Sequence, residues 1–191
     1  MSCEFPALIL LSAGGGRRMG GPKGLIAVDG TPLVRAHLDA FASVSSERTV
    51  VLGADAAAHL CHVPPGVRVV FNPDWSRSWP ADSLQLALRG RPIPLRAWVC
   101  PVDVPPPSPA VLRALLQGPG DRVPTDPDGR PGHPVLVTHN VLQKCQVAPP
   151  HGGLRTLIGT AQRVPTAAPV ALNFNSAASL ESFVRARRAG E

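Results

Sequence analysis

The sequence of 191 residues predicts an α/β fold in which a mostly parallel sheet has helices on both faces. Apolar runs of β type alternate with segments of helical periodicity along the chain, and a glycine-rich loop follows the first apolar run directly. The length suits a single domain over residues 1–191. Because ligands bind beyond the carboxyl ends of the strands in such sheets, the glycine-rich loop is the first candidate site.

The predicted strands are short continuous apolar runs, which are typical of strands buried on both faces. We expect them over 5–12, 48–53, 67–72, 96–104 and 133–138. The glycine-rich loop follows the first of these strands, and Asp103 stands at the end of the fourth. Both features therefore belong at the same edge of the predicted sheet.

The predicted helices are recognised by apolar spacing and by their end signals. The segment 31–41 starts with Thr31 as N-cap and Pro32 at the first helical position. The segment 108–118 starts with Ser108 as cap and stops at a glycine. Further helices are expected over 56–61, 82–90 and 179–188, the last with basic residues at its C-terminal end, where the helix dipole favours them.

Composition narrows the class of partner. The chain carries 19 Lys and Arg against 13 Asp and Glu, but it has no Tyr and no long basic run, so an anionic small substrate is favoured over nucleic acid. The apolar run 5–11 is too short to span a bilayer and does not resemble a signal peptide, so no membrane association is expected. The four cysteines, beginning with Cys3, form no close pair, which predicts reduced thiols in a cytoplasmic protein.

The loop 13–23 matches neither of the two common phosphate-binding templates. A P-loop needs Ser or Thr after its Gly-Lys pair, whereas Lys23 stands between Pro22 and Gly24. The dinucleotide fingerprint needs a glycine where this chain has Met19. Glycines still let backbone N–H groups approach an anion closely, and an arginine and a lysine can bind phosphate oxygens. A strand-to-helix turn with exposed cations is the alternative interpretation.

The loop resembles the signature L-x-A-G-x-S-x-R-M-G-x-x-K of the nucleotidyltransferases that build molybdenum cofactor dinucleotides. The matching residues are Leu11, Ala13, Gly14, Arg18, Met19, Gly20 and Lys23. The segments 28–41, 72–88, 100–116 and 128–137 resemble the later segments of the same family, so the resemblance covers most of the chain.

The resemblance implies a Rossmann-like fold of the nucleotide-diphospho-sugar transferase type and a Mg²⁺-dependent reaction. Such enzymes move a nucleoside monophosphate from a triphosphate to a phosphorylated acceptor, such as the molybdenum cofactor. Ala13 and the trio 132–134 are more similar to the cytidylyl branch, so CMP is favoured and GMP is the alternative.

The resemblance also implies roles for individual residues. Arg18 and Lys23 hold the triphosphate, and Asp103 binds Mg²⁺. His133 contacts the acceptor. The expected nucleotide-binding residues are Leu11, Ser12, Ala13, Gly14, Gly15, Gly16, Arg18, Lys23 and Ser83.

Several of these residues have a plainer interpretation. Asp103 fits a turn before three prolines, and His133 fits a strand edge. Trp75 and Trp79 either stack on a base or a pterin or pack a loop over the sheet.

The chain departs from the family near its C-terminus. Asn173 and Asn175 stand where the resemblance leads us to expect the aspartates of an Asp-x-Asp-Thr segment. An amide oxygen can bind Mg²⁺ but brings no charge, so Asn175 is a doubtful ligand and the site should be weaker. Two hypotheses follow. The chain is an active nucleotidyltransferase, or it is a nucleotide-binding relative that serves as a partner or chaperone of a molybdoenzyme in cofactor maturation.

Overall fold

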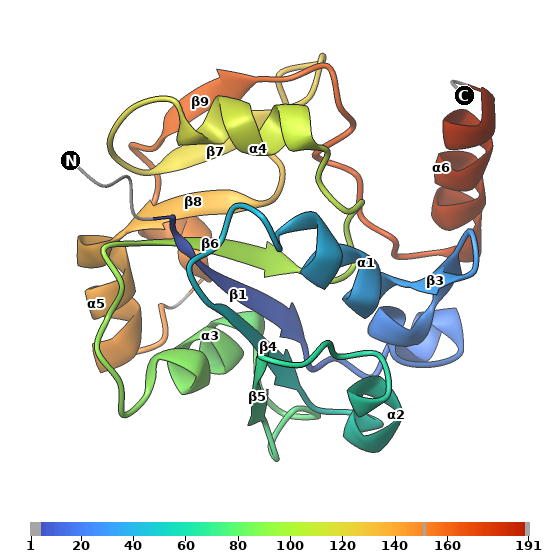
Figure 1. Cartoon of the computed structure of the whole chain (residues 1–191), viewed down its shortest axis with the longest axis horizontal. Coiled ribbons are helices and arrows are strands. Elements are labelled where there is room, and N and C mark those ends of the chain that lie inside the picture. Colours follow the sequence, from blue (N-terminus) through green and yellow to red (C-terminus); the bar gives the residue numbers. More distant parts are fainter. Residues whose placement is uncertain (1–4, 151, 190–191) are drawn as a thin grey trace.

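Seven strands form the central sheet in the order β5-β4-β1-β6-β8-β7-β9 (Figure 1). The computed structural model describes residues 5–150 and 152–189. The strands of this sheet are β1 (Ala7–Ser12), β4 (Arg48–Leu52), β5 (Arg68–Phe71), β6 (Arg96–Pro101), β7 (Arg122–Thr125), β8 (Val135–Thr138) and β9 (Gln162–Pro165). β8 runs antiparallel to β6 and β7, and the other neighbouring pairs are parallel. The predicted mostly parallel sheet is confirmed.

Helices cover both faces of the sheet, as predicted. They are α1 (Leu33–Ala40), α2 (Ala56–Leu60), α3 (Pro80–Leu88), α4 (Pro109–Leu116), α5 (His139–Val147) and α6 (Ala177–Ala189), with the 3₁₀ turns η1 (Arg17–Met19), η2 (Lys23–Leu25) and η3 (Leu154–Thr156). The alternation of side chains along β1 divides the core in two. Leu8 and Leu10 pack in the layer of α1 and α4, whereas Ala7 and Ile9 pack in the layer of α3 and α5.

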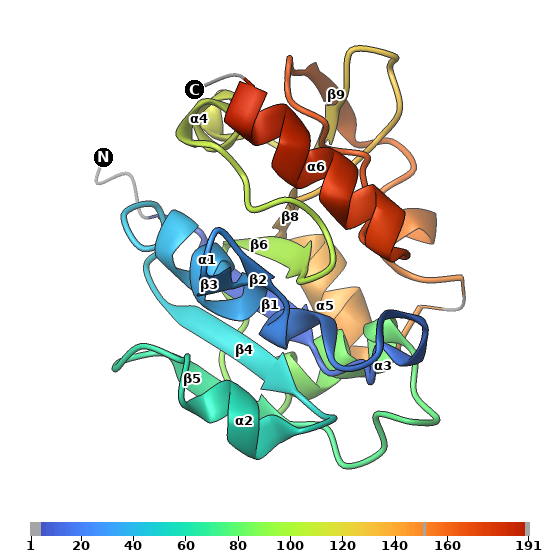
Figure 2. The same cartoon turned by 90° about the vertical axis from the view of Figure 1, so that its right-hand side faces the viewer.

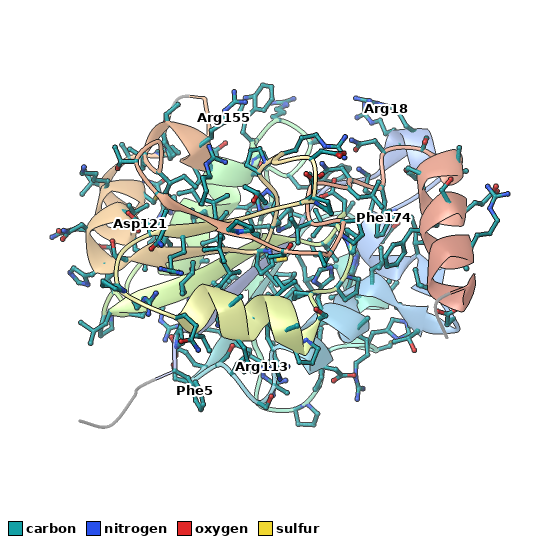
Figure 3. The ribbon with its side chains drawn as sticks, turned by 90° about the horizontal axis from the view of Figure 1, so that it is seen from above. Phe5, Arg18, Arg113, Asp121, Arg155 and Phe174 are labelled. Carbon is teal, nitrogen blue, oxygen red and sulfur yellow. The ribbon has the colours of Figure 1, made fainter. Side chains whose placement is uncertain are left out.

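The last helix lies outside these two layers. Figures 1 and 2 both show α6 beyond the carboxyl end of β6. Phe174, which precedes α6, is fully buried, and its ring centroid lies 5.3 Å from that of Phe183 in the helix. Figure 3 shows Phe174 beside α6. This aromatic pair fastens the C-terminal segment to the core.

The predicted start of the first helix is wrong. Thr31 and Pro32 form β3 (Thr31–Pro32), which pairs antiparallel with β2 (Ala27–Val28), and α1 begins only at Leu33. Asp29 and Gly30 both have positive φ, as a tight hairpin turn requires, so the chain leaves the turn extended. Thr31 therefore continues a strand and does not cap the helix.

The fourth predicted strand is shorter than expected, because β6 ends at Pro101 and Asp103 lies two residues beyond it. The prolines 105–107 that follow have no N–H to continue a ladder. For α4 the predicted signals are confirmed. The Ser108 hydroxyl accepts a hydrogen bond from the Val111 N–H at 3.4 Å, and Gly118 has a φ of 102° just beyond the helix.

β7, β9 and α5 were not expected from the sequence. β7 contains Pro124 and β9 ends in Pro165, and a proline within a run argues against a strand. Cys61, Cys100 and Cys145 are free thiols, as predicted, while Cys3 lies outside the described residues. Among the described helices, none has the length and apolar character that crossing a membrane would need.

Candidate functional site

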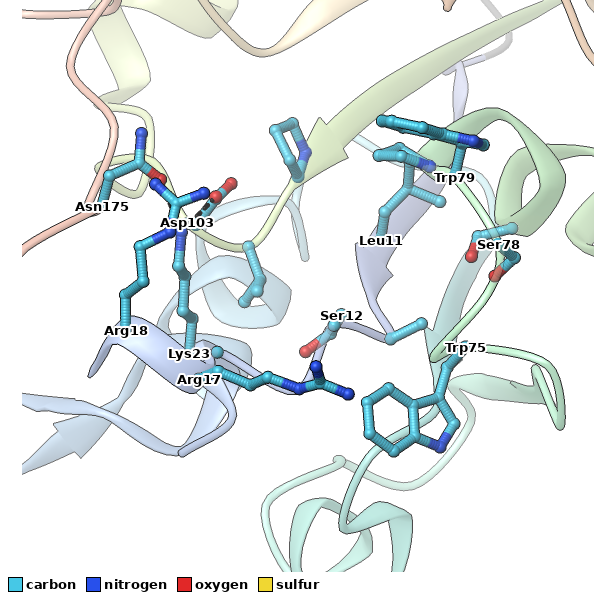
Figure 4. A pocket seen from close by; sticks show the side chains of 17 residues that line it. Leu11, Ser12, Arg17, Arg18, Lys23, Trp75, Ser78, Trp79, Asp103 and Asn175 are labelled. Atoms are coloured by element: carbon cyan, nitrogen blue, oxygen red, sulfur yellow. Dashed lines mark hydrogen bonds and ion pairs between the residues drawn. The ribbon is translucent and has the colours of Figure 1, made fainter. Parts of the chain in front are cut away.

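A cleft of about 430 Å³ opens at the carboxyl ends of β1 and β6 (Figure 4). Its walls come from the loop after β1, the segment 75–83, the residues just after β6, and Asn175. β4 and β5 lie on one side of β1, and β6 lies on the other. The cleft therefore lies where the strand order reverses, which is the usual ligand site of such sheets.

The glycine-rich loop turns back on itself before it reaches Lys23. Gly16 has a φ of 57°, and a Cβ at this position would lie 1.9 Å from the carbonyl oxygen of Gly21. The Met19 N–H closes the turn by donating to the Gly16 carbonyl at 2.7 Å. A Cβ at Gly14, in contrast, would meet no atom within 4 Å, so the backbone at this position faces open space in the cleft.

Lys23 joins the two oxygens that were predicted to bind a metal. Its Nζ donates to Asp103 Oδ2 at 2.8 Å and to Asn175 Oδ1 at 2.7 Å (Figure 4). The Phe174 N–H donates to the Asp103 carbonyl at 2.7 Å, which holds the neighbouring Asn175 beside this aspartate. Residues far apart in the sequence thus converge on one cation.

Two arginines add positive charge to the cleft. Arg18 is exposed, and its side chain points toward the same end as that of Lys23 (Figure 4). Arg17 also lines the cleft, and its guanidinium extends toward Ser12 and Trp75. Arg17 was missed as a site residue, although its position next to Arg18 in η1 was the available signal.

The two tryptophans of the segment 75–83 have different surroundings. A Cβ at Gly15 would lie 2.6 Å from the Trp75 ring, so Trp75 packs against the glycine-rich loop. Trp79 lines the cleft with 78% of its surface exposed. Of the two interpretations, loop packing describes Trp75, whereas Trp79 keeps a free ring at the cleft.

Hydroxyl groups complete the lining of the cleft. Ser83 is buried but reaches the cleft, and its Oγ accepts a hydrogen bond from Asn72 Nδ2 at 3.0 Å. The Ser12 Oγ is also buried in the lining and has no hydrogen-bond partner among the described residues. Leu11, Ala13 and Gly16 line the same cleft, while Gly15 is not part of the lining.

His133 and Asn173 do not join this cleft. His133 lines a neighbouring hollow of about 410 Å³ together with the prolines 105–107 and the start of α4. Its N–H donates to the Val170 carbonyl at 3.0 Å, and burial lowers the pKa of its imidazole, which keeps the ring neutral at pH 7. Asn173 is exposed and donates to the Ala171 carbonyl at 3.3 Å.

Two residues of the cleft could hold a divalent cation. Asp103 and Asn175 present hard oxygen atoms, which Mg²⁺ and Mn²⁺ prefer, and the ammonium of Lys23 already bridges them as a stand-in cation. No group of three or more His, Cys, Asp or Glu that could hold a metal ion occurs in the described part of the chain. One carboxylate and one amide therefore form the candidate site.

The chain matches a known family over most of its length. Residues 8–165 match the family model described as the MobA-like NTP transferase domain. The chain belongs to this family. It is therefore a nucleotidyltransferase, which confirms the resemblance found in the sequence. No curated protein sequence matches the chain significantly.

Solved structures with low sequence identity share the fold. A homologue of Mycobacterium tuberculosis Rv0371c from Mycobacterium sp. strain JC1 is 24% identical with a TM-score of 0.80, covering 97% of this chain and 98% of that one. A nucleotidyl transferase from Methanothermobacter is 21% identical with a TM-score of 0.78, covering 98% and 99%. The molybdopterin-guanine dinucleotide biosynthesis protein A from Archaeoglobus fulgidus is 16% identical with a TM-score of 0.65, covering 96% and 99%.

Proposed function

We propose that the chain is a Mg²⁺-dependent enzyme that transfers CMP from CTP to a phosphorylated acceptor, with GMP as the alternative group. The observation that supports this most is the convergence of Arg18, Lys23 and Asp103 at one end of the cleft. The backbone of Gly14, which no other atom covers, lines the same cleft. The cleft thus holds three cationic side chains, because Arg17 lines it as well, and one hard oxygen ligand, which together suit a triphosphate with its metal ion.

In the proposed reaction an oxygen of the acceptor phosphate forms a bond to the α-phosphorus. The bond from that phosphorus to the bridging oxygen breaks, and pyrophosphate leaves with the electron pair. Arg18 and Lys23 hold the triphosphate and neutralise the charge that develops on the leaving group, while the Gly14 backbone lies against the phosphates. Asp103 and Asn175 would hold Mg²⁺, which supplies additional positive charge to the phosphate oxygens when bound.

The molybdenum cofactor is the acceptor that we favour. The Archaeoglobus fulgidus neighbour carries a name from this biosynthesis, and His133 offers a neutral imidazole in the hollow next to the cleft. In this role the chain would work in the cytoplasm and deliver its product to a molybdoenzyme. The metal is supported by a structure of Rv0371c that contains manganese, which is 22% identical to this chain with a TM-score of 0.77 and covers 95% of this chain and 98% of that one.

A second function is favoured by one observation. Asn175 supplies an amide where a carboxylate would add charge to the metal site. A weakened site would leave a nucleotide-binding protein that assists cofactor maturation as a partner or chaperone, with little transfer of its own.

Titration with CTP, GTP and ATP, with and without Mg²⁺, followed by an assay of pyrophosphate release in the presence of the molybdenum cofactor as acceptor, separates these functions. We expect Mg²⁺-dependent CTP binding and pyrophosphate release that is lost in Asp103→Asn. Asp39→Asn is the matched control, because Asp39 pairs with Arg35 on the surface of α1. Binding without release in the wild type would support the second function. If Asp103→Asn retained full transfer activity, the metal-assisted mechanism would be wrong.

A further inference from the structure

The segment 102–104, which carries Asp103, has already left the sheet. β6 ends at Pro101, and the prolines 105–107 that follow Val104 have no N–H to donate. Val104 is only 1% exposed, so its carbonyl needs a hydrogen-bond donor from elsewhere in the fold. The position of the Asp103 carboxylate therefore depends on what holds this short segment.

His37 in α1 supplies the donor that the Val104 carbonyl needs. The His37 ring is fully buried on the face of α1 that packs against the core, and its Nε2 lies 3.0 Å from the Val104 carbonyl oxygen. Burial lowers the pKa of the ring to about 4, so the ring is neutral at pH 7 and carries a single N–H. Because a carbonyl oxygen can only accept, that proton is on Nε2.

The other ring nitrogen faces the end of β6. With the proton on Nε2, Nδ1 of His37 is an acceptor, and it lies 3.7 Å from Cys100 Sγ. Cys100 precedes the segment 102–104, and Val104 is its last residue. The imidazole therefore contacts the chain on both sides of Asp103.

Two backbone hydrogen bonds hold the same segment from other directions. The Val102 N–H donates to the Leu11 carbonyl at 2.9 Å, and the Asp103 carbonyl accepts from the Phe174 N–H at 2.7 Å. Neither of these two bonds reaches Val104, the residue directly after the aspartate. The hydrogen bond from His37 thus fixes the chain on the far side of Asp103.

We propose that His37 is a positioning residue that holds Asp103 where it can bind the metal ion together with Asn175. The proposal rests on the nucleotidyltransferase function proposed above, in which Asp103 binds Mg²⁺. Without the His37 donor the buried Val104 carbonyl would lose its partner, and the segment would shift to find another. The oxygens of Asp103 and Asn175, which now converge on one cation, would then separate.

Two substitutions of His37 separate its hydrogen bond from its packing. His37→Phe keeps an aromatic ring of comparable size but has no donor, whereas His37→Gln offers an amide N–H to the same carbonyl. We expect the affinity for Mn²⁺, measured by calorimetry without nucleotide, to fall by about tenfold in His37→Phe and to stay within about twofold of the wild type in His37→Gln. CTP binding without a metal ion should not be weakened in either variant, because this binding does not need the metal ligand.

Leu38→Ala is the matched control for a loss of stability. Leu38 is fully buried in the same helix but has no polar group, so its truncation leaves a cavity without removing a hydrogen bond. Under conditions where urea unfolding shows each variant to be folded, the Mn²⁺ affinity of Leu38→Ala should equal that of the wild type.

Nuclear magnetic resonance tests the wild type without any substitution. The ¹⁵N resonances of His37 should show the proton on Nε2 and none on Nδ1. Addition of Mg²⁺ should shift the Nε2 resonance, because the hydrogen bond to Val104 connects the ring to the residue next to Asp103.

The outcomes distinguish the positioning role from the function on which it rests. Wild-type Mn²⁺ affinity in His37→Phe, an equal loss in His37→Gln or in Leu38→Ala, or a proton on Nδ1 of the wild type overturns the role and leaves the transferase function standing. If the wild type binds neither Mn²⁺ nor CTP, the proposed function fails and the positioning role fails with it. A loss in His37→Phe that His37→Gln restores supports the proposal.

Discussion

Removing the charge of Lys23 should strengthen the binding of a divalent metal ion when no nucleotide is present. In the ligand-free protein the ammonium of Lys23 occupies both candidate metal ligands, Asp103 Oδ2 and Asn175 Oδ1. A metal ion must displace it, and a triphosphate assists by attracting the lysine to its own oxygens. We therefore expect Lys23→Met to bind Mn²⁺ more tightly than the wild type while binding CTP more weakly.

The size of the effect follows from the geometry of the ion pair. At 2.8 Å the Coulomb attraction is about 6 kcal/mol for an effective dielectric constant of about 20. Desolvation and lost side-chain freedom offset most of this, and exposed pairs retain only about 0.2–1 kcal/mol. Because the side chains of Lys23 and Asp103 are only 18% and 28% exposed, we take about 1–2 kcal/mol as the net term. The affinity for Mn²⁺ should then rise about five- to thirty-fold.

Calorimetry or the paramagnetic resonance signal of free Mn²⁺ measures this affinity without any turnover. Lys144→Met is the matched control, because the sequence contains only two lysines and Lys144 lies in α5, away from the cleft. Its Mn²⁺ affinity should equal that of the wild type. An unchanged or lower affinity in Lys23→Met would refute the reasoning, because the lysine would then not compete with the metal.

Four further predictions concern stability, the loop and the metal site. Burial lowers the pKa of His37 from 6.5 to about 4, so the unfolded chain takes up a proton at higher pH than the folded protein does. The free energy of unfolding should therefore fall by about 3 kcal/mol as the pH is lowered from 6.5 to 4. Urea unfolding across this range should show the loss, and His37→Gln should reduce it. Gly14→Ala should leave the melting temperature unchanged but weaken CTP binding, because its Cβ would enter open cleft space. Gly24→Ala should lower the melting temperature, because the new Cβ would clash with the side chains of Ser12 and His59. Asn175→Asp, measured in the Lys23→Met background, should raise Mn²⁺ affinity by about tenfold, and an unchanged affinity would show that this position does not reach the metal.

The sequence predicted the parts of the fold that depend on local pattern. Apolar runs such as that of β1 predicted the parallel strands, and the N-cap residue Ser108 predicted the start of α4. The residue types and spacing of the glycine-rich loop also singled out Arg18 and Lys23, which line the cleft; their role in holding a triphosphate stays a prediction. β9 was not predicted, since a strand at the sheet edge with a proline and few buried residues shows no apolar pattern.

Other features of the site depend on contacts that no local pattern contains. The Ser78 and Ser83 hydroxyls both accept a hydrogen bond from Asn72 Nδ2, and the Asp74 N–H fixes this amide by donating to its Oδ1. The bridge from Lys23 to Asn175 joins residues 152 positions apart. Such contacts form only when the chain folds, so the sequence could indicate the residues but not which of them would be in contact.

The hydrogen bond from the Phe174 N–H to the Asp103 carbonyl means that the candidate metal site depends on residues beyond the last strand of the sheet. The family match stops at residue 165, which is also the last residue of β9, so a chain truncated there would retain every strand of the described sheets. It would nevertheless lose the N–H that holds the Asp103 carbonyl, the buried ring of Phe174 and the amide of Asn175. The truncated chain would then have the strands of the family domain but an incomplete candidate metal site, because the last components of that site lie beyond the matched residues 8–165.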